Sequence, residues 1–138
     1  MPSEFELTDS EDVLARFLLK KNHFKRTENR PTPEAFMPPP DLKLSVYKIT
    51  NIPQDEIWML GRTVLEQHPQ PRLYGRADVR VGAVHDQKLK AIQDDNPPRH
   101  VNVIGWPSYA DGKDLMKSLA QQLARSAKLD MLPTPLSK

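Results

Sequence analysis

The chain has no cysteine among its 138 residues, so disulfides, thiolate zinc sites and a cysteine nucleophile are excluded. Glycine is scarce, with five residues, and neither a G-x-G-x-x-G run nor a Walker loop occurs, which speaks against the standard dinucleotide and ATP sites. No apolar run is long enough to cross a bilayer, and the first residues lack a secretion-signal pattern. We therefore expect a cytoplasmic protein that needs no cofactor and binds no membrane.

Proline, in contrast, is abundant, with 14 residues concentrated at 31–40, 69–71, 97–98 and 133–135. We interpret these clusters as rigid connectors between elements. A chain of this length fits one domain with its own core. We place that domain at 9–130, with flexible ends at 1–8 and 131–138 and a Pro-rich basic loop at 22–41 within it.

The hydrophobic periodicity predicts an alternation of helices and strands. Thr8 and Glu11 form a capping-box pattern that predicts a first helix over 9–21. Strands are expected at 42–50, 72–81 and 99–105, and further helices at 53–68, 84–93 and 112–128. Because helices link these strands, parallel pairing is favoured.

The expected fold is therefore α+β, or small α/β, with a three- to four-stranded sheet. Two main helices, at 53–68 and 112–128, are expected to pack on one face of this sheet. The other, polar face would be open or covered only by the Pro-rich loop. The tail after Asp130 should be loose, because its prolines interrupt regular structure.

Two stretches alternate polar and apolar residues, as a strand does when one of its faces is solvated. In residues 73–81 the polar positions are Tyr74, Arg76, Asp78 and Arg80. In residues 99–107 they are His100 and Asn102, and the adjacent Arg99 is a further candidate binding residue. If the two polar faces align in one sheet, the chain has one binding place, because arginine forks recognise phosphate or carboxylate. The alternative is a solvent-exposed face of the sheet on which the charged side chains pair with one another.

His100 is the one candidate catalytic residue, as a general base, although a hydrogen-bonded structural histidine is the alternative. The four histidines share no short ligand spacing, so no metal site is expected. Ser45 and Ser108 lack the G-x-S-x-G setting of a nucleophile elbow. The adjacent carboxylates Asp94 and Asp95 precede a proline pair, where acids serve turns.

Charge is nearly balanced overall, at +2, but it is unevenly distributed. A basic patch is expected within residues 20–30, formed by Lys20, Lys21, Lys25, Arg26 and Arg30. Such a run can face phosphate, or it can be a solvated helix end followed by a loop.

Three runs resemble a family of small uncharacterised bacterial proteins. They are Y-G-R-A-D at 74–78, R-H-V-N-V-I-G-W-P at 99–107, and A-F-M-P at 35–38. The resemblance covers about residues 14–128. It implies a bacterial, intracellular origin, and it carries no known activity.

Two hypotheses of function follow. The first is a binding or accessory module that uses the polar strand face and the basic patch to hold a protein or nucleic-acid partner. The second is a small enzyme for a nucleotide-like or phosphorylated substrate, with Arg76 and Arg80 as clamps and His100 moving a proton. The second requires these three side chains to converge on one concavity.

Overall fold

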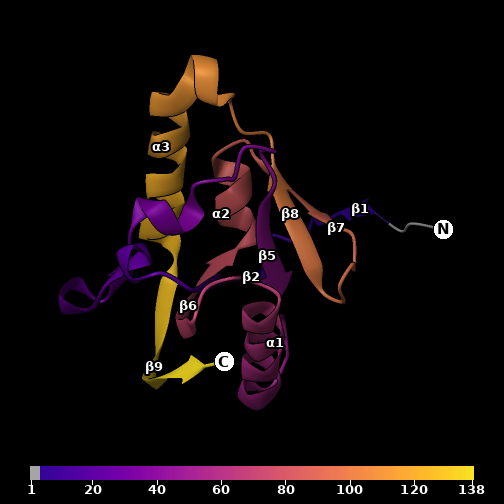
Figure 1. Cartoon of the computed structure of the whole chain (residues 1–138). Coiled ribbons are helices and arrows are strands. Elements are labelled where there is room, and N and C mark those ends of the chain that lie inside the picture. The colour runs from indigo at the N-terminus through magenta and orange to yellow at the C-terminus, as the bar shows by residue number, and fades with distance from the viewer. Residues whose placement is uncertain (1–3) are drawn as a thin grey trace.

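A seven-stranded sheet runs through the centre of the computed structural model, which describes residues 4–138 (Figure 1). The strand order is β1-β7-β8-β5-β2-β6-β9, and every pairing among the described strands is antiparallel. The strands are β1 (Phe5–Glu6), β2 (Val13–Leu18), β5 (Leu44–Lys48), β6 (Arg72–Arg80), β7 (Lys90–Gln93), β8 (His100–Ile104) and β9 (Lys128–Ser137).

The remaining elements surround this sheet. A separate two-stranded ribbon consists of β3 (Phe24–Lys25) and β4 (Arg30–Pro31). The α-helices are α1 (Gln54–Glu66), α2 (Val81–Asp86) and α3 (Tyr109–Ser126), and single 3-10 turns occupy Lys21–His23, Arg26–Glu28 and Pro33–Phe36. The part of the chain that the structure describes contains no helix long and apolar enough to span a membrane.

The prediction of a three- to four-stranded sheet with an N-terminal helix is wrong. Each α-helix does link strands that point the same way, as the predicted helix–strand order implied, but those strands are not neighbours. Between β5 and β6, which α1 connects, lies β2, antiparallel to both. Other strands therefore lie between each pair of helix-linked strands, and the sheet is larger than expected and antiparallel.

The predicted helix over 9–21 is instead the central strand β2. Its apolar residues were spaced as on a helix stripe, but a strand buried on both faces also lacks simple alternation. Leu14 and Leu18 enter one core, and Ala15 and Phe17 enter the other. The expected cap is a tight turn, in which the amide of Glu11 donates to the side chain of Asp9 at 2.9 Å.

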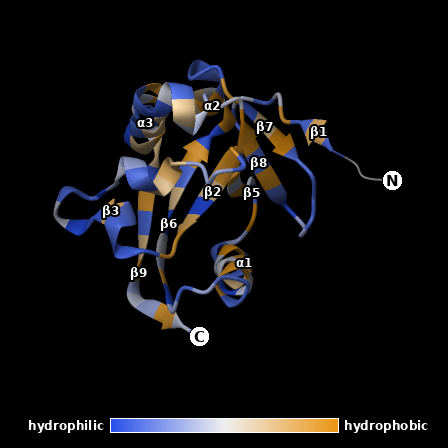
Figure 2. Ribbon diagram, turned by 45° about the horizontal axis from the view of Figure 1, so that its top comes forward, coloured by the Kyte–Doolittle hydropathy of each residue, from blue (hydrophilic) through white to orange (hydrophobic). Residues whose placement is uncertain are grey.

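The helices lie on both faces of the sheet, not on one (Figure 2). On one face α1 packs through Ile57, Val64 and Leu65. On the other face α3 packs through Met116, Ala120 and Leu123, together with α2. This three-layer arrangement buries apolar side chains from every central strand.

The Pro-rich loop covers the α3 face and not the polar strand face. Its 3-10 turn carries Phe36, which is 1% exposed and packs in the core beneath α3. Burial of one such side chain stabilises the fold by about 1.5–3 kcal/mol. The loop is thereby anchored over one end of the sheet.

Two further expectations are corrected at the C-terminal half. The helix expected over 84–93 is split, because α2 begins at once after β6 and the strand β7 follows it. The tail expected to be loose forms β9, which pairs with β6 from Arg72 to Asp78. An edge strand tolerates proline because one side of it needs no ladder hydrogen bonds. The sheet thus extends beyond the 9–130 domain boundaries at both ends.

Candidate functional site

Arg76, at the centre of the first predicted polar stripe, is enclosed within the protein. Its side chain is 2% exposed, and its Nε donates to Asp78 at 3.0 Å. Its Nη2 lies 2.9 Å from Gln54 and 3.1 Å from Asp130. The guanidinium also stacks 4.6 Å from the centre of the Trp58 ring of α1. Two carboxylates and a helix therefore hold this arginine through Nε and Nη2, while its Nη1 is buried without a partner among the described residues.

The other members of that stripe point elsewhere. The β6–β9 register shifts at Tyr74, whose ring packs 5.4 Å from that of Phe24, away from α1. Arg80 is exposed and donates to Glu11 at 2.5 Å. Such an exposed ion pair adds little stability.

The two predicted polar stripes do not form one site. Two strands, β5 and β2, lie between β8 and β6, which separates the stripes by about 14 Å at the usual strand spacing. Arg76, Arg80 and His100 thus do not converge, and the enzyme hypothesis with those two arginines as clamps has no geometric support.

The second stripe does assemble a polar network. His100 places Nδ1 2.8 Å from Asp94 Oδ1 and Nε2 3.0 Å from Ser45 Oγ. Asn102 donates to the other oxygen of Asp94 at 3.1 Å. Burial works to raise the pKa of Asp94, but hydrogen bonds from the Asn96 amide and from His100 outweigh it and hold that pKa below its ordinary value. The carboxylate is therefore ionised at neutral pH.

Arg99 does not join this network. It is exposed, lies in the turn between β7 and β8 with φ of 71°, and its amide donates to Asp95 at 3.1 Å. The turn role expected for the paired acids is present as well, because the Asn96 amide donates to Asp94 at 3.1 Å.

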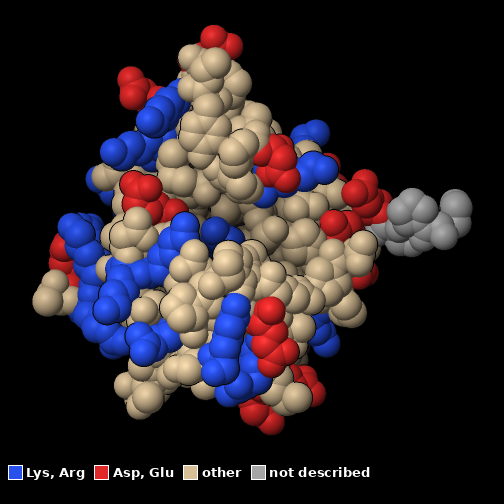
Figure 3. All heavy atoms as spheres, viewed as in Figure 1, with Lys and Arg blue, Asp and Glu red and all other residues tan. Residues whose placement is uncertain are grey.

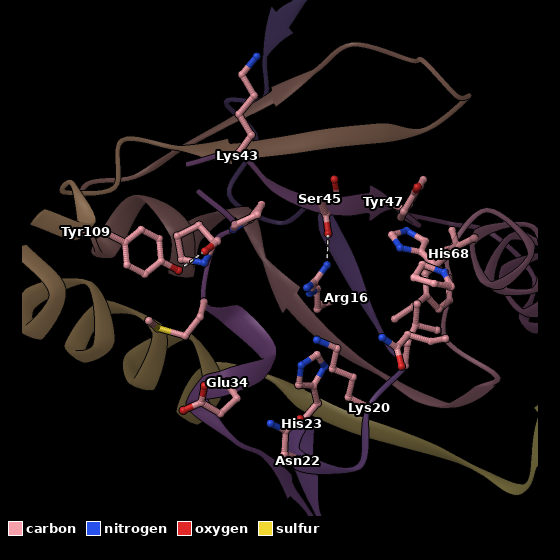
Figure 4. A pocket seen from close by; sticks show the side chains of 18 residues that line it. Arg16, Lys20, Asn22, His23, Glu34, Lys43, Ser45, Tyr47, His68 and Tyr109 are labelled. Atoms are coloured by element: carbon pink, nitrogen blue, oxygen red, sulfur yellow. Dashed lines mark hydrogen bonds between the residues drawn. The ribbon is translucent and has the colours of Figure 1, made fainter. Parts of the chain in front are cut away.

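A cleft of about 530 Å³ opens where β2 and β5 separate (Figure 4). The two strands pair only at Leu14–Lys48 and Ala15–Tyr47, although β2 continues to pair with β6 as far as Leu18. Continued pairing would place Ser45 opposite Phe17. Instead the strands diverge, and both of those residues line the cleft. Its volume lies in the range of small-molecule sites.

Arg16 stands at the centre of this divergence. Its Nε donates to the Ala35 carbonyl at 2.8 Å and its Nη1 to the Ser45 carbonyl at 3.0 Å, where a strand amide would otherwise pair. Burial lowers the pKa of Arg16 to about 10, so it remains a cation at neutral pH. Among residues 4–138 Arg16 forms no salt bridge, and its side-chain hydrogen bonds there use Nε and Nη1 only.

Further basic and polar groups surround Arg16. Figure 4 shows Lys20 and His23 on one side of it and Lys43 beyond Ser45 on the other. Glu34 is the only acidic residue among the described lining residues, against the three cations Arg16, Lys20 and Lys43. The cleft is therefore electropositive.

His23 is a further polar residue in the wall of this cleft. It is 9% exposed, and its Nδ1 is buried without a partner among the described residues. Burial, reinforced by Arg16 and Lys20, lowers the pKa of His23 to about 4. An uncharged histidine therefore lies beside the two cations Arg16 and Lys20 in the wall of the cleft.

Apolar side chains form another part of the cleft wall. The rings of Phe17 and Tyr47 pack in a tilted arrangement with 5.8 Å between their centres, and Met37, Val64 and prolines also line the cleft. Tyr109 reaches over from α3 and donates to the Pro38 carbonyl, which ties the Pro-rich loop to the helix. A ligand with both an anionic and an apolar part would match this combination.

The basic patch lies beside the cleft on a protruding segment. Figure 3 shows Lys and Arg side chains gathered over the β3–β4 region. Glu28 lies 3.4 Å from Lys25 and 2.6 Å from Arg30, which offsets part of the patch. Lys20 lines the cleft, whereas Lys21 and Arg26 line a second groove with Phe24, Arg72 and Tyr74.

Sequence reasoning missed Arg16, Ser45 and Asp94 as site residues. One signal for Arg16 was present, since it is the lone charge within the apolar run V-L-A-R-F-L. The pairing of Ser45 with His100 depends on strand order, which local patterns do not contain.

No group of three His, Cys, Asp or Glu side chains within residues 4–138 is placed to hold a metal ion.

Fold and site together describe a three-layer protein with an electropositive cleft in the middle of an antiparallel sheet. Comparisons with protein-family models, with curated proteins and with solved structures find no match to this chain. The resemblance to small bacterial proteins, and the cytoplasmic location it implies, stay predictions.

Proposed function

We propose that the protein is a binding module whose cleft holds a phosphorylated ligand of the nucleotide class. The observation that carries this proposal is Arg16, a partly buried guanidinium that lines the cleft and forms no salt bridge among the described residues. A cation withdrawn from water costs free energy unless an anion or several hydrogen bonds compensate it. Two backbone carbonyls accept hydrogen bonds from Nε and Nη1 of the guanidinium. A ligand oxygen would accept a further hydrogen bond from Nη2.

The shape of the cleft favours an organic phosphate over the inorganic ion. One phosphate fills only a small part of about 530 Å³. The rings of Phe17 and Tyr47 offer an apolar surface for a base or another apolar group, and Lys20 adds a second positive charge for the phosphate. A nucleoside monophosphate such as AMP has both parts.

Titration calorimetry with AMP, adenosine and inorganic phosphate tests the proposal. We expect AMP to bind more tightly than adenosine, because only AMP pairs with the cations. Arg16→Met removes the charge at similar length and should weaken AMP binding about 10- to 100-fold, the value of one or two charge-assisted hydrogen bonds. Arg125→Met, at an exposed position on α3, is the matched control.

A second variant protects the test against a folding defect in Arg16→Met. Lys20 is exposed at the cleft, so Lys20→Ala should fold normally and weaken AMP several-fold, with Lys117→Ala on α3 as its control. Equal affinity for adenosine and AMP, or no AMP binding to the wild-type protein, would contradict the proposal.

A single-stranded nucleic acid with a terminal phosphate is the second candidate, favoured by the neighbouring groove. There two aromatic rings, Phe24 and Tyr74, lie among Lys21, Arg26 and Arg72, and Arg26 lies 5.6 Å from the centre of the Phe24 ring. Aromatic platforms among cations are typical of single-strand binding. A 5′-phosphorylated oligothymidylate should then bind more tightly than its unphosphorylated form, with affinity falling as salt rises.

A further inference from the structure

The network of Ser45, His100 and Asp94 has the connectivity of a nucleophile with its base and a positioning carboxylate. Ser45 Oγ lies 3.0 Å from His100 Nε2, and His100 Nδ1 lies 2.8 Å from Asp94 Oδ1. These distances fall in the range for proton transfer along the chain of groups. The three residues come from β5, from β8 and from the turn that precedes β8.

The protonation state of this network follows from its partners. Asp94 is ionised and only accepts hydrogen bonds, so His100 Nδ1 carries the proton that faces it. In the neutral form of this ring Nε2 is the acceptor of the hydrogen bond that the Ser45 hydroxyl donates. This is the orientation in which an imidazole can remove the serine proton. Asn102 holds the second oxygen of Asp94 at 3.1 Å and fixes the carboxylate.

Access and surroundings suit a reaction at Ser45. Ser45 is partly exposed and lines the cleft, whereas the His100 side chain is 12% exposed and the Tyr47 ring packs against it at 5.4 Å. Lys43, two residues before Ser45, also lines the cleft. Its flexible ammonium is the group available to an oxyanion that develops beside Ser45.

We propose that Ser45 is a catalytic nucleophile that hydrolyses carboxylic esters, with His100 as general base and Asp94 as positioning residue. Oγ forms a bond to the ester carbonyl carbon while its proton passes to His100 Nε2. The alcohol then leaves with that proton, and the acyl group remains on Ser45. Water, deprotonated by His100, attacks the acyl-enzyme and releases the carboxylic acid, which restores Ser45.

This reaction goes beyond ligand binding and does not require it. An ester whose remote end carries a phosphate would use both features, with the cations of the cleft holding that end; this choice of substrate rests on the proposed function. The nucleophile itself can be tested with a probe that has no phosphate anchor, so the two proposals can fail separately.

The test uses a fluorophosphonate probe, whose phosphorus accepts a serine oxygen as fluoride leaves, and 4-nitrophenyl acetate as the ester. We expect the wild-type protein to be labelled, with the adduct on the peptide that contains Ser45 by mass spectrometry. Ser45→Ala should abolish labelling and ester turnover. Ser118→Ala, at an exposed position of α3, should leave both unchanged.

Variants of the partners separate chemistry from structure. His100→Gln should lower the labelling rate and turnover at least about 100-fold, the usual contribution of a general base. Asp94→Asn should also slow labelling, because an amide can stabilise the wrong histidine tautomer. Circular dichroism and melting temperature report the fold, and Ser45→Ala, which removes one hydroxyl, keeps the test valid if the other variants unfold.

Three results would overturn the proposal: no labelling of the folded wild-type protein, an adduct on another residue, or labelling that Ser45→Ala retains. If AMP binds while Ser45 is inert, the cleft proposal stands and this one fails. If Ser45 is labelled while AMP does not bind, the reverse holds.

Discussion

At the scale of single residues, two arginines on one strand illustrate how surroundings decide a role. Arg76 is buried among two carboxylates, an amide and a tryptophan, whereas Arg80 is exposed with one exposed partner. Burial raises the pKa of Asp78, and the charge and hydrogen bond of Arg76 oppose that rise. Removal of Arg76 would leave this carboxylate withdrawn from water without its partner.

We therefore predict that Arg76→Met destabilises the protein by about 3–5 kcal/mol, the usual effect of breaking a buried ion pair. Arg80→Met should change stability by less than about 0.5 kcal/mol. Urea unfolding of the two variants measures the contrast. Equal, small effects would show that Arg76 does not hold β6, β9 and α1 together.

His23 makes a prediction about acid stability. Its pKa is about 4 in the folded protein and about 6.5 in an unfolded chain. Between these values the unfolded state binds more protons, so stability is fully present above about pH 6.5 and falls as the pH is lowered toward 4. The loss amounts to at most about 3 kcal/mol.

Replacement of His23 removes this titration. His23→Gln should lose less stability than the wild-type protein between pH 7 and pH 4.5, as measured by urea unfolding at each pH. Parallel pH profiles of the two proteins would contradict the burial of an unprotonated His23 in the cleft.

At the scale of elements, the close approach of α1 to the sheet is a testable feature. A Cβ atom on Gly61 would lie 2.8 Å from Phe17 and 2.9 Å from Leu73. Alanine normally favours a helix over glycine by about 1 kcal/mol, but here the added methyl group would push α1 away from β2 and β6.

Gly61→Ala should therefore destabilise the protein by about 1–3 kcal/mol, the range for overpacking. Ser118→Ala, on the exposed face of α3, should be neutral or slightly stabilising. Thermal unfolding compares the two. A stabilised Gly61→Ala protein would mean that α1 does not pack this closely.

Helices and strands could be predicted from the sequence where the residue pattern was typical of only one kind of element. The helices over 54–66 and 109–126 and the strands over 44–48, 72–80 and 100–104 fall where their periodicity placed them. The strand β2 did not, because burial on both faces removes the alternation that marks a strand. Prolines such as those of β9 also occur in loose tails. Only the pairing with β6 shows that this segment is an edge strand.

The candidate site was less predictable than the elements. Arg16 depends on the divergence of two strands far apart in sequence. The contact of Ser45 with His100 depends on β5 and β8 being neighbours, and no residue pattern specifies that. Long-range strand order is fixed by how the two cores fill, which is a property of the whole chain.

At the scale of the whole molecule, a ligand that binds only the folded state must stabilise it. At 100 times its dissociation constant, AMP should add about 2.7 kcal/mol to the free energy of unfolding. For a chain of this size that is a rise of roughly 8 °C in melting temperature. Calorimetry should show this rise in the wild-type protein and in Arg125→Met, and a much smaller one in Arg16→Met at the same AMP concentration.

We propose that the phosphate of AMP lies in the cleft beside Arg16, and the pKa of His23 reports this position directly. The measurement is an NMR titration of the His23 ring with and without saturating AMP. A phosphate anion next to the ring favours its protonated form, so we predict a pKa near 4 in the free protein and a value at least about one unit higher in the complex. An unchanged His23 pKa in a protein that has bound AMP would place the ligand elsewhere and contradict the account.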